Sequence, residues 1–346
     1  MRLLPALAVA AGLAGCGASD DALVTYQLPV MATLFEVSLP RHDGPPDPNL
    51  LPAIETRLRA IERDFYAWGD GELAALNAAL SAGERFEASE AMAALLVDAQ
   101  AISAASDRAF DPGVGALVEL WGFHVTEKPE VAPEPDRIEA TRTASGSIGE
   151  IVIADAIDVA ASASGRRFLL DLGGIAKGYA VDEVVAILEA AGVAPAVVNA
   201  GGDLRTLGSR PDRRWQIGIA SPRGDELLGT LALDAGEAAF TSGDYERYFD
   251  DDTGTRQHHI LDPRNGRPAT HTRAVTVIAD NGTLADAAAT ALLVAGPTRW
   301  RSVAAALDLA MVLRVDASGA IEMTTAMRDR FQPSETSGSD IIIAAD

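Results

Sequence analysis

Several short runs rich in β-branched and aromatic residues follow one another in the middle of the chain, with gaps too small for a helical crossover. These runs are Ile151–Ile153, Phe168–Leu170, Ala196–Val198, Trp215–Ile219, Thr230–Leu233 and Ala274–Ile278. A parallel pair of strands needs a crossover of a dozen or more residues, so we expect antiparallel pairs here. Apolar residues at helical spacing predict helices from Leu51, near Met92, at Tyr179–Ala191 and at Leu284–Val294. The sequence therefore predicts an α+β fold with antiparallel sheets and packed helices.

The N-terminal segment has the pattern of a bacterial lipoprotein leader. Arg2 precedes the apolar stretch Leu3–Gly15, which has the length of a secretory h-region and ends in the lipobox-like Leu13-Ala14-Gly15-Cys16. Cleavage before Cys16 leaves its sulfur to carry a lipid. We therefore expect a mature chain that is exported and tethered to a membrane of the bacterial cell envelope, facing the periplasm. An ordinary signal peptide that contains a cysteine is the alternative.

The rest of the chain forms one main domain in this interpretation. We predict a signal peptide over residues 1–15, a lipidated cysteine and tether over 16–27, a main domain over 28–333 and a tail over 334–346. The main domain begins with a strand at Leu28–Leu39, and Ile341–Ile343 can add an edge strand within the tail.

Composition excludes two classes of protein. The formal charge is −22 at pH 7 and no long basic run offsets it, whereas a nucleic-acid surface needs clustered Lys and Arg. The single cysteine cannot form a disulfide within the chain. A nucleic-acid-binding protein and a disulfide scaffold are both excluded.

The densest motif is a glycine turn between a predicted strand and a predicted helix, Leu170-Asp171-Leu172-Gly173-Gly174-Ile175-Ala176-Lys177-Gly178-Tyr179-Ala180. Glycines let a ligand approach the backbone, and a helix N-terminus with a lysine attracts phosphate. The spacing matches neither the P-loop nor the dinucleotide-binding fingerprint, which leaves an anion site and a structural turn equally open. A second glycine motif, Asn199 to Asp203, favours a bulged turn when taken alone.

Asp286 and Thr290 stand one helical turn apart in an alanine-rich segment, so a carboxylate and a hydroxyl share one helix face. Oxygen ligands suit Mg²⁺, which keeps several waters and shares the phosphates of a substrate. The alternative is structural, because a helix dipole stabilises an early Asp and a Thr can bond back to its own helix. Taken alone, the two residues favour the structural interpretation.

A fourth motif joins Thr241–Tyr248 to the adjacent residues His258 and His259. Neighbouring residues of a strand point to opposite faces, so the two imidazoles cannot easily bind one metal. One imidazole can act as a general base, and the other belongs to the surface or to packing. Zinc has little support from five histidines without an available cysteine, and Ser242 is not part of a serine-hydrolase elbow.

Taken together, these segments resemble the ApbE-type family, the bacterial FAD:protein FMN transferases. The matching segments run in order through Met31-Ala32-Thr33, Phe110-Asp111-Pro112, Trp121-Gly122-Phe123, Asp171 to Asp182, Asn199 to Asp203, Ser242-Gly243, His259 to Gly266, and Asp286 to Thr290. They span nearly the whole mature chain, and the lipobox fits the family as well. The resemblance implies a T-fold-like α+β architecture with the flavin between two lobes.

The resemblance also implies a reaction and a set of site residues. Such an enzyme depends on Mg²⁺, splits FAD at its pyrophosphate, releases AMP and joins FMN through a phosphoester to a threonine of a partner flavoprotein. The implied flavin contacts are Met31, Trp68, Ala109, Phe110, Asp111, Asp171, Lys177 and His259. The implied metal ligands are Asp286 and Thr290, with main-chain oxygens of Gly174 and Ala289.

Two residues depart from the family pattern. Ala32 stands in place of the usual glycine, and Gly71 stands in place of the usual serine before Glu72. Neither change removes an acid, a base or a metal ligand. They bear on local flavin contacts more than on the reaction.

The implied catalytic residues are His259 and Asp286. His259 serves as general base for the acceptor threonine, while Mg²⁺ and Lys177 neutralise the phosphate oxygens. We expect the rate to follow one deprotonation around the ordinary imidazole pKa of about 6.5. We also expect His258 to tolerate alanine, and Asp244 is the next candidate base.

Two other functions stay open at this point. An FAD pyrophosphatase has the same site but uses water, and it releases FMN and AMP. A non-catalytic flavin-binding lipoprotein binds the flavin without reaction.

Overall fold

The structure is a computed structural model, and it describes residues 23–40, 47–125, 127, 131–155, 157–162, 165–210, 213–334 and 341–343. The predicted leader and Cys16 lie outside these residues. Within the described ranges, no helix combines the length and the apolar character needed to cross a membrane.

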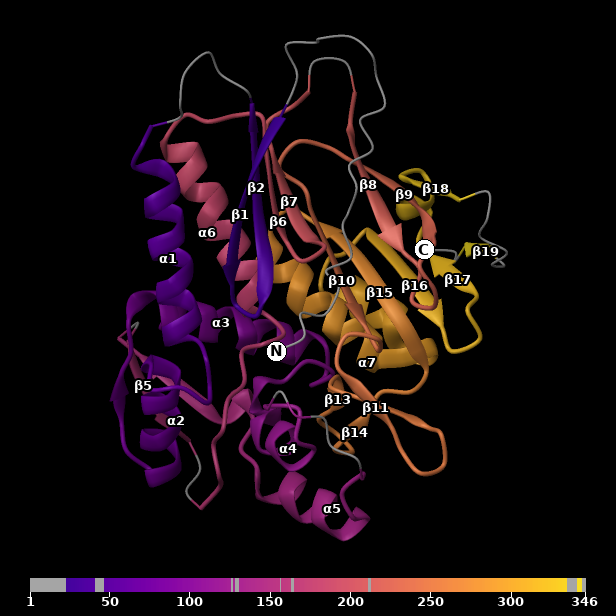
Figure 1. Cartoon of the computed structure of the whole chain (residues 1–346). Helices are drawn as coiled ribbons and strands as arrows, with labels where there is room; N and C mark the ends of the chain where they lie inside the picture. The colour runs from indigo at the N-terminus through magenta and orange to yellow at the C-terminus, as the bar shows by residue number, and fades with distance from the viewer. Residues whose placement is uncertain are drawn as a thin grey trace.

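A nine-stranded sheet forms the centre of the molecule (Figure 1). Its strands, in spatial order, are β1 (Leu23–Val30), β2 (Thr33–Pro40), β6 (Ala196–Ala200), β7 (Asp203–Leu207), β10 (Ala238–Gly243), β15 (Thr272–Ala279), β16 (Met311–Asp316), β17 (Ile321–Met323) and β19 (Ile341–Ile343). All neighbours pair antiparallel except β17 and β19, which pair parallel. The predicted antiparallel α+β fold is confirmed, and so is the edge strand at Ile341–Ile343.

The two faces of this sheet carry different layers. Four helices pack toward one face, namely α1 (Leu50–Asp64), α3 (Glu90–Ala105), α6 (Ala176–Ala190) and α7 (Gly282–Ala306) (Figure 1). The other face carries a three-stranded sheet and a short helix, namely β8 (Trp215–Ala220), β9 (Leu227–Leu233), β18 (Phe331–Pro333) and α8 (Thr325–Arg328). Alternation along β15 divides its side chains, with Val275 and Val277 facing the helices and Ala274 and Ile278 facing the small sheet.

A second region lies below the central sheet in Figure 1. It contains α2 (Glu72–Ala82), α4 (Gly115–Leu120), α5 (Pro135–Ala144), the 3-10 turns Pro112–Val114 and Ile148–Glu150, the sheet of β3 (Phe86–Glu87), β5 (Asp158–Ala161) and β4 (Ile151–Ala154), and the hairpins β11 (Tyr248–Asp250) with β12 (Arg256–His258) and β13 (Leu261–Asp262) with β14 (Arg267–Pro268). A small apolar cluster that includes Trp121, Phe123 and Phe249 joins α4 to these hairpins. Trp121 Nε1 also donates to Gly266 O at 2.8 Å, so two distant parts of the chain are fixed together.

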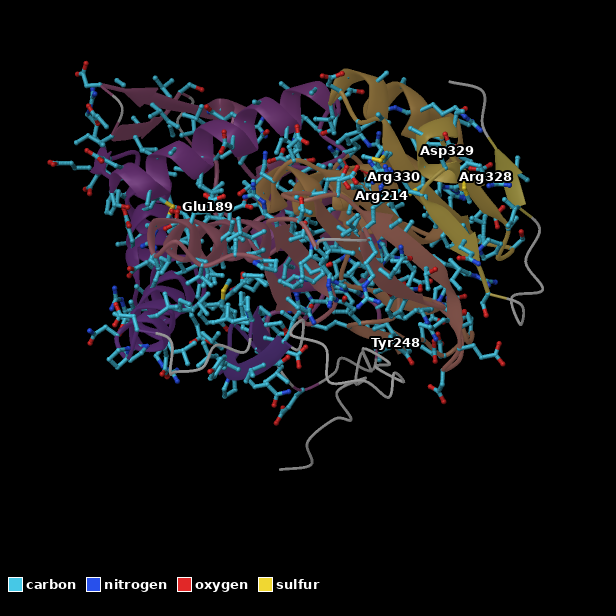
Figure 2. All side chains as sticks on the ribbon, turned by 90° about the horizontal axis from the view of Figure 1, so that it is seen from above. Glu189, Arg214, Tyr248, Arg328, Asp329 and Arg330 are labelled. Atoms are coloured by element: carbon cyan, nitrogen blue, oxygen red, sulfur yellow. The ribbon has the colours of Figure 1, made fainter. Side chains whose placement is uncertain are left out.

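Ion pairs fasten one end of the small sheet, where its three strands begin or end. Arg214 and Arg330 lie side by side in Figure 2, and both contact Asp234, through Nε at 2.8 Å and Nη2 at 2.7 Å. Asp234 follows β9 and Arg330 precedes β18, so the pairs tie the ends of neighbouring strands. Partly exposed pairs of this kind contribute about 1 kcal/mol at most. The buried apolar cluster beneath them carries the larger share of stability.

The predicted strand Phe168–Leu170 is wrong. Side chains of α2 take its backbone hydrogen bonds instead of a neighbouring strand. Asn77 donates to Leu170 O at 3.0 Å and accepts from Leu170 N at 2.7 Å. Ser81 likewise donates to Phe168 O at 2.8 Å and accepts from Phe168 N at 3.2 Å. Polar residues of α2 therefore replace a neighbouring strand as hydrogen-bond partners. The sequence of Phe168–Leu170 does not indicate this.

The predicted single strand Leu28–Leu39 is a hairpin. Its strands β1 and β2 meet at the turn Met31-Ala32, and β1 begins at Leu23, within the expected tether. The φ angles of Met31 and Ala32 are 55° and 54°, in the left-handed region. Two-residue hairpin turns with this backbone usually contain Asn or Gly, so Met31-Ala32 carries no turn signature in the sequence.

Gly71, the second departure from the family pattern, stands where a larger side chain does not fit. Gly71 is the N-cap residue immediately before α2, and a Cβ placed there would lie 1.9 Å from Arg63 O. Arg63 belongs to the last turn of α1, so the two helices meet backbone to backbone. A serine at position 71 does not fit without moving one of the helices.

We expect Ala32→Gly to stabilise the fold and Gly71→Ser to destabilise it. A left-handed backbone costs an L-residue about 1–2 kcal/mol, and glycine avoids this cost. Glycine also loses more conformational entropy on folding, so the net gain in folding stability from Ala32→Gly is roughly 0.5–1 kcal/mol. Gly71→Ser costs roughly 1–3 kcal/mol through overpacking. Thermal unfolding of both variants measures the shifts. Gly149→Ala, where a Cβ meets only one ordinary contact, serves as the control, and shifts of the same sign at positions 32 and 71 would contradict the argument.

Candidate active site

An open pocket lies where the second region meets the central sheet and the helices α6 and α7. Five segments line it: α4 with the chain on either side of it, the loop before α6 with the first turn of α6, the end of β10 with the turn after it, the segment following β12, and the first half of α7. The lining residues are Ala109, Phe110, Asp111, Pro112, Val114, Val118, Phe123, Asp171, Gly173, Gly174, Lys177, Thr241, Ser242, Gly243, Glu246, Arg247, His259, Ile260, Leu261, Pro263, Asp286 and Thr290. Most of the residues that the sequence singled out therefore meet in one place.

The glycine turn before α6 brings its backbone to the pocket. Asp171 Oδ1 accepts a hydrogen bond from Gly173 N at 2.9 Å, which closes the turn. Burial raises the pKa of Asp171 above its ordinary value, and the Gly173 N–H opposes this rise. A Cβ on Gly174 would lie 3.4 Å from Thr290 Oγ1, so the turn packs directly against α7. The structure thus brings Gly174 and Thr290 together.

Asp286 is a buried carboxylate where α7 meets the start of α6. Its residue is only 5% exposed, and Oδ2 accepts a hydrogen bond from Gly178 N at 2.9 Å. Burial raises the pKa of Asp286 to about 7, although Lys177 opposes the rise. One turn further along α7, the hydroxyl of Thr290 lies 3.1 Å from Ser242 Oγ. A carboxylate and two hydroxyls therefore line the same part of the pocket.

Lys177 supplies positive charge on the α6 wall. Its ammonium forms an ion pair with Asp203, whose other oxygen accepts from Thr241 N at 2.8 Å. Burial alone would lower the pKa of Lys177, but the carboxylates of Asp203, Glu246 and Asp286 raise it above its ordinary value. The lysine is therefore charged at every physiological pH.

His259 lines the pocket immediately after β12. Its backbone N–H donates to Arg247 O at 3.0 Å, and its Nδ1 lies 3.2 Å from the same oxygen. A carbonyl oxygen only accepts, so Nδ1 carries the hydrogen and Nε2 keeps a free lone pair. Burial lowers the pKa of His259 well below 6.5, and the positive charge of Arg247 lowers it further. The imidazole is a neutral proton acceptor at pH 7, and the expectation of a titration around 6.5 is corrected to a lower pH.

His258 belongs to the core and not to the pocket. It is 2% exposed, its Nε2 lies 2.7 Å from Ala269 O, and its Nδ1 accepts from Ile260 N at 3.3 Å. Burial lowers the pKa of His258, so the ring is neutral. The two adjacent imidazoles have different environments, as predicted, although His259 lies just after β12 and not on the opposite face of the same strand. Because the ring is packed and hydrogen-bonded, we no longer expect His258 to tolerate alanine.

We expect His258→Ala to lower the free energy of unfolding by about 3 kcal/mol. The substitution leaves a cavity and removes the ring partners of two buried backbone groups. Denaturant unfolding monitored by circular dichroism measures the change. His271→Ala is the matched control because His271 is exposed, and it should change stability by less than about 0.5 kcal/mol. Equal effects of the two substitutions would show that the buried ring is dispensable.

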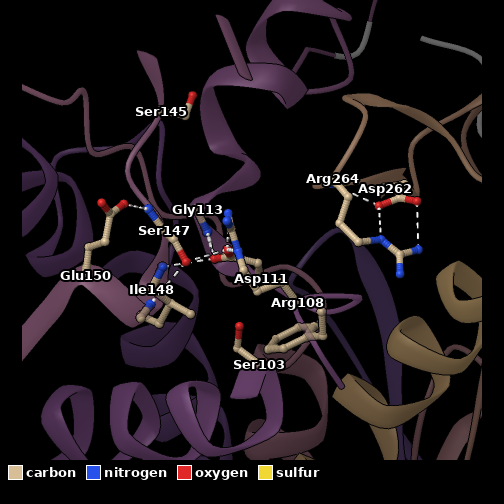
Figure 3. A network of polar contacts seen from close by, with 12 residues as sticks. Ser103, Arg108, Asp111, Gly113, Ser145, Ser147, Ile148, Glu150, Asp262 and Arg264 are labelled. Atoms are coloured by element: carbon tan, nitrogen blue, oxygen red, sulfur yellow. Dashed lines mark hydrogen bonds and ion pairs between the residues drawn. The ribbon is translucent and has the colours of Figure 1, made fainter. Parts of the chain in front are cut away.

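Asp111 is held on the opposite wall by a network of donors (Figure 3). Its carboxylate accepts from the backbone N–H of Gly113 (2.9 Å) and Ile148 (3.0 Å), from Ser147 Oγ (2.7 Å) and from Arg108 Nε (3.0 Å). Both oxygens are thus engaged by the protein, and the carboxylate fixes the shape of the segment that includes Ala109 and Phe110. Direct contact of Asp111 with a flavin stays a prediction.

Three implied site residues lie elsewhere than in the lining of the described pocket. Met31 occupies the hairpin turn, where its N–H donates to Glu62 Oε1 at 2.7 Å. The ring of Trp68 lies 5.6 Å from that of His124, measured between centroids. Ala289 is fully buried next to Thr290. Their contacts with flavin or metal stay predictions.

Sequence reasoning missed Glu246 and Arg247, which line the pocket from the turn after β10. It named Asp244 in the same turn as an alternative base. Asp244 instead forms a two-point ion pair with Arg223, with both contacts at 2.7 Å, and it is not among the lining residues of the pocket. The available signal was the position of a polar turn directly after the strand that carries Ser242.

Asp203 is brought next to the lining residue Lys177 in a way that its motif alone did not show. The segment Asn199 to Asp203 is a tight hairpin turn between β6 and β7 and not a bulge. Gly201 and Gly202 have φ angles of 70° and 110°, which favour glycine. The turn places Asp203 at the start of β7, where it contacts Lys177.

The fold and the pocket define a class of protein. An α+β scaffold joins a lysine, a neutral histidine and an oxygen-rich pair of helix residues in one pocket with an apolar side. Such a set suits a substrate that carries phosphate groups and an aromatic ring system.

Comparison with known proteins identifies the family within this class. The sequence model of the ApbE family matches residues 31–313, and the chain belongs to this family. It is 38% identical to the FAD:protein FMN transferase of Rhodobacter capsulatus over 339 residues, which cover 95% of this chain and 63% of that protein. It is 31% identical to the enzyme of the same name from Vibrio cholerae over 90% of this chain and 94% of that one.

Solved structures agree with this assignment. The ApbE protein of Thermotoga maritima has a TM-score of 0.81 and 32% identity, covering 90% of this chain and 100% of that chain. The flavinyl transferase ApbE of Pseudomonas stutzeri has a TM-score of 0.78 and 30% identity, covering 92% of this chain and 99% of that one.

Proposed function

We propose that this chain is an enzyme that transfers FMN from FAD to a protein. The relatives from Rhodobacter capsulatus and Vibrio cholerae carry the name of this activity. The observation that carries the proposal is the meeting of Lys177, His259 and Asp286 in one pocket. Segments separated by about eighty and about thirty residues supply these groups, so the fold and not local sequence assembles them.

In the proposed reaction the acceptor is a threonine hydroxyl of a partner flavoprotein, as the family resemblance implies. Its oxygen attacks the phosphorus of the FMN phosphate, and the bond from this phosphorus to the bridging oxygen of the pyrophosphate breaks. AMP leaves with that oxygen. The hydroxyl proton moves to Nε2 of His259, which keeps a free lone pair because Nδ1 is directed to Arg247 O.

Lys177 and the apolar side of the pocket would position FAD. The ammonium lies at the start of α6, where the helix N-terminus also favours the negative charge of a phosphate. The apolar lining offers a surface for the rings of the substrate, and it consists of Phe110, Val114, Val118, Phe123, Ile260 and Leu261. The lysine and this surface are separate parts of one pocket, as a molecule with both chemical features requires.

The residues present fit a Mg²⁺ ion. Among the described residues, no three His, Cys, Asp or Glu side chains gather as a metal-binding group, so an ion here would rely on few charged ligands. Asp286 and Thr290 would hold it, with main-chain oxygens of Gly174 and Ala289, and Mg²⁺ completes such partial sets with water and substrate phosphates. The buried carboxylate whose pKa is raised to about 7 is a group that a cation would stabilise. When bound, the ion supplies neutralisation of charge on the phosphate oxygens.

We expect His259→Ala to slow FMN transfer by about 10²- to 10⁴-fold, the usual contribution of one positioned base. FAD binding, measured separately by flavin fluorescence, should change much less. The acidic limb of the wild-type rate should lie well below pH 6.5, because the pKa of His259 is lowered and the base is lost only when the pH falls through that value. A rate profile that falls around pH 6.5, or near wild-type transfer by the variant, would place the base elsewhere.

We expect Asp286→Asn to abolish Mg²⁺ binding and FMN transfer while the fold survives. Asparagine keeps an oxygen that can accept from Gly178 N, so only the charge is removed. Thr290→Val should weaken both properties less, since a neutral hydroxyl contributes less to a divalent site than a carboxylate does. Titration calorimetry with Mg²⁺ measures the affinity, and wild-type affinity in Asp286→Asn would refute the metal assignment.

One incubation separates the proposed transferase from the two alternatives. The protein is mixed with FAD, Mg²⁺ and a threonine-bearing acceptor domain, and the acceptor is then denatured. Flavin retained on the denatured acceptor supports transfer. Free FMN and AMP without retained flavin identify a pyrophosphatase, and unchanged FAD identifies a flavin-binding protein without activity.

We also propose that the protein is a lipoprotein anchored in the bacterial cell envelope. The support is the lipobox-like Leu13-Ala14-Gly15-Cys16 and the apolar stretch before it. In this arrangement residues 1–15 are removed and Cys16 carries the lipid. The catalytic domain extends beyond the expected bounds of 28–333, because β1 begins at Leu23 and β19 pairs with β17.

A further inference from the structure

Glu246 is an unpaired carboxylate at the mouth of the pocket. It lines the pocket while remaining exposed to solvent, and within the described part of the chain it makes no hydrogen bond or ion pair. Partial burial among protein atoms raises the pKa of Glu246; Lys177 opposes the rise and Asp203 adds to it. The carboxylate therefore influences the pocket through long-range electrostatic interaction and not through a hydrogen bond or an ion pair.

Acidic side chains outnumber basic ones at the pocket. The ammonium of Lys177 is matched by Asp203, and the carboxylate of Asp111 is matched by Arg108. The remaining charged lining residues are Asp171, Glu246 and Asp286, which are acids, and Arg247, which is a base. His259 is neutral, so it does not change this balance.

A pocket with an excess of acidic side chains is a poor receptor for FAD on its own. The two phosphate groups of the substrate each carry a negative charge, and like charges repel over the width of such a pocket. A divalent cation removes this repulsion. Of the three unmatched acids, Asp286 is committed by its bond to Gly178 N and Asp171 by its bond to Gly173 N, whereas Glu246 has no such structural bond.

We propose that Glu246 makes the binding of FAD conditional on a divalent cation, because its exposed and unbonded carboxylate adds negative charge at the pocket. This inference rests on the proposed function, since it takes FAD as the substrate. In this role Glu246 is neither the general base nor a metal ligand. It opposes the substrate without the cation and attracts the cation that the substrate needs.

The test compares FAD affinity with and without Mg²⁺ in the wild type and in Glu246→Gln. Flavin fluorescence quenching measures the dissociation constant without any reaction, if acceptor is omitted and the time is kept short. We expect Glu246→Gln to bind FAD about fivefold more tightly without Mg²⁺, the effect of one unit charge at roughly 8 Å in an effective dielectric constant of about 40. The gain in FAD affinity on adding Mg²⁺ should shrink by the same factor.

A second readout uses the cation alone. Calorimetric titration with Mg²⁺ in the absence of FAD should show an affinity that is weaker by about the same factor in Glu246→Gln. Glu246→Asp keeps the charge and should restore both affinities toward the wild-type values. Because the side chain is exposed, neither substitution should shift the thermal unfolding midpoint, which verifies that the fold is intact.

Asp329→Asn is the matched control. It removes the same unit of charge from an exposed residue that does not line the pocket, and in Figure 2 Asp329 lies well apart from Tyr248, which is two residues after Glu246. Its FAD and Mg²⁺ affinities should equal those of the wild type. A similar effect of both substitutions would overturn the inference in favour of overall net charge.

The two proposals fail in different ways. If the wild type binds FAD equally well with and without Mg²⁺, or if Glu246→Gln has the wild-type metal-free affinity, the role of Glu246 is overturned while the transferase stands. If the wild type binds no FAD even with Mg²⁺, the proposed function itself is overturned, and the role of Glu246 falls with it.

Discussion

The close crossing of α6 and α7 is the constraint on which the site depends. A Cβ on Gly178 would lie 2.1 Å from Gly282 O, and one on Gly282 would lie 2.7 Å from Gly178 O, so the two backbones touch. The helices also cap one another. Asp182 of α6 accepts from the N–H groups of Gly282 and Thr283 at 2.8 Å each, while Asp286 of α7 accepts from Gly178 N. Each helix thus supplies a carboxylate to the positive end of the other, and their starts are held side by side.

This crossing sets the electrostatics of the pocket. One oxygen of Asp286 accepts a hydrogen bond from Gly178 N. The residue is buried, and burial disfavours the charged carboxylate and so raises its pKa. Lys177, at the start of the same helix α6, is drawn to Asp203 from the neighbouring hairpin. The fold therefore brings opposite charges into one pocket but leaves acids in excess. Because the excess of acidic groups repels phosphate, such a site requires a cation before it binds a phosphate-bearing molecule.

The sequence predicted the fold class because the short strands and the helices carry regular apolar patterns, and because small gaps force antiparallel pairing. It failed where side chains replace expected partners. Asn77 and Ser81 satisfy the backbone of Phe168–Leu170, and Met31-Ala32 turns without a turn residue. For Asp286, the residues alone favoured a structural role and the resemblance implied a site. In the structure Asp286 both caps the start of α6 and lines the pocket, so a structural role and a role in the site are compatible. Glu246 was missed, although it lies in the polar turn directly after the strand that carries Ser242, because its place in the pocket depends on how that turn meets a distant helix.

A second link fixes the base relative to α7. The helix is broken at Gly296, where φ is 66° and ψ is −169°, and Pro297 follows, so carbonyl groups before the break lose their helical partners. Arg264 Nη2 donates to one of them, Val294 O, at 3.2 Å. Asp262 holds the same guanidinium through two bonds of 2.8 Å (Figure 3). The half of α7 before the break carries Asp286 and Thr290. Its C-terminal end is therefore tied to the segment that begins with His259, and its N-terminal end is held by α6. Because that half-helix is anchored at both ends by different segments, it cannot slide along its axis without breaking one anchor, and the separation between the base and the oxygen-rich face is set by the fold.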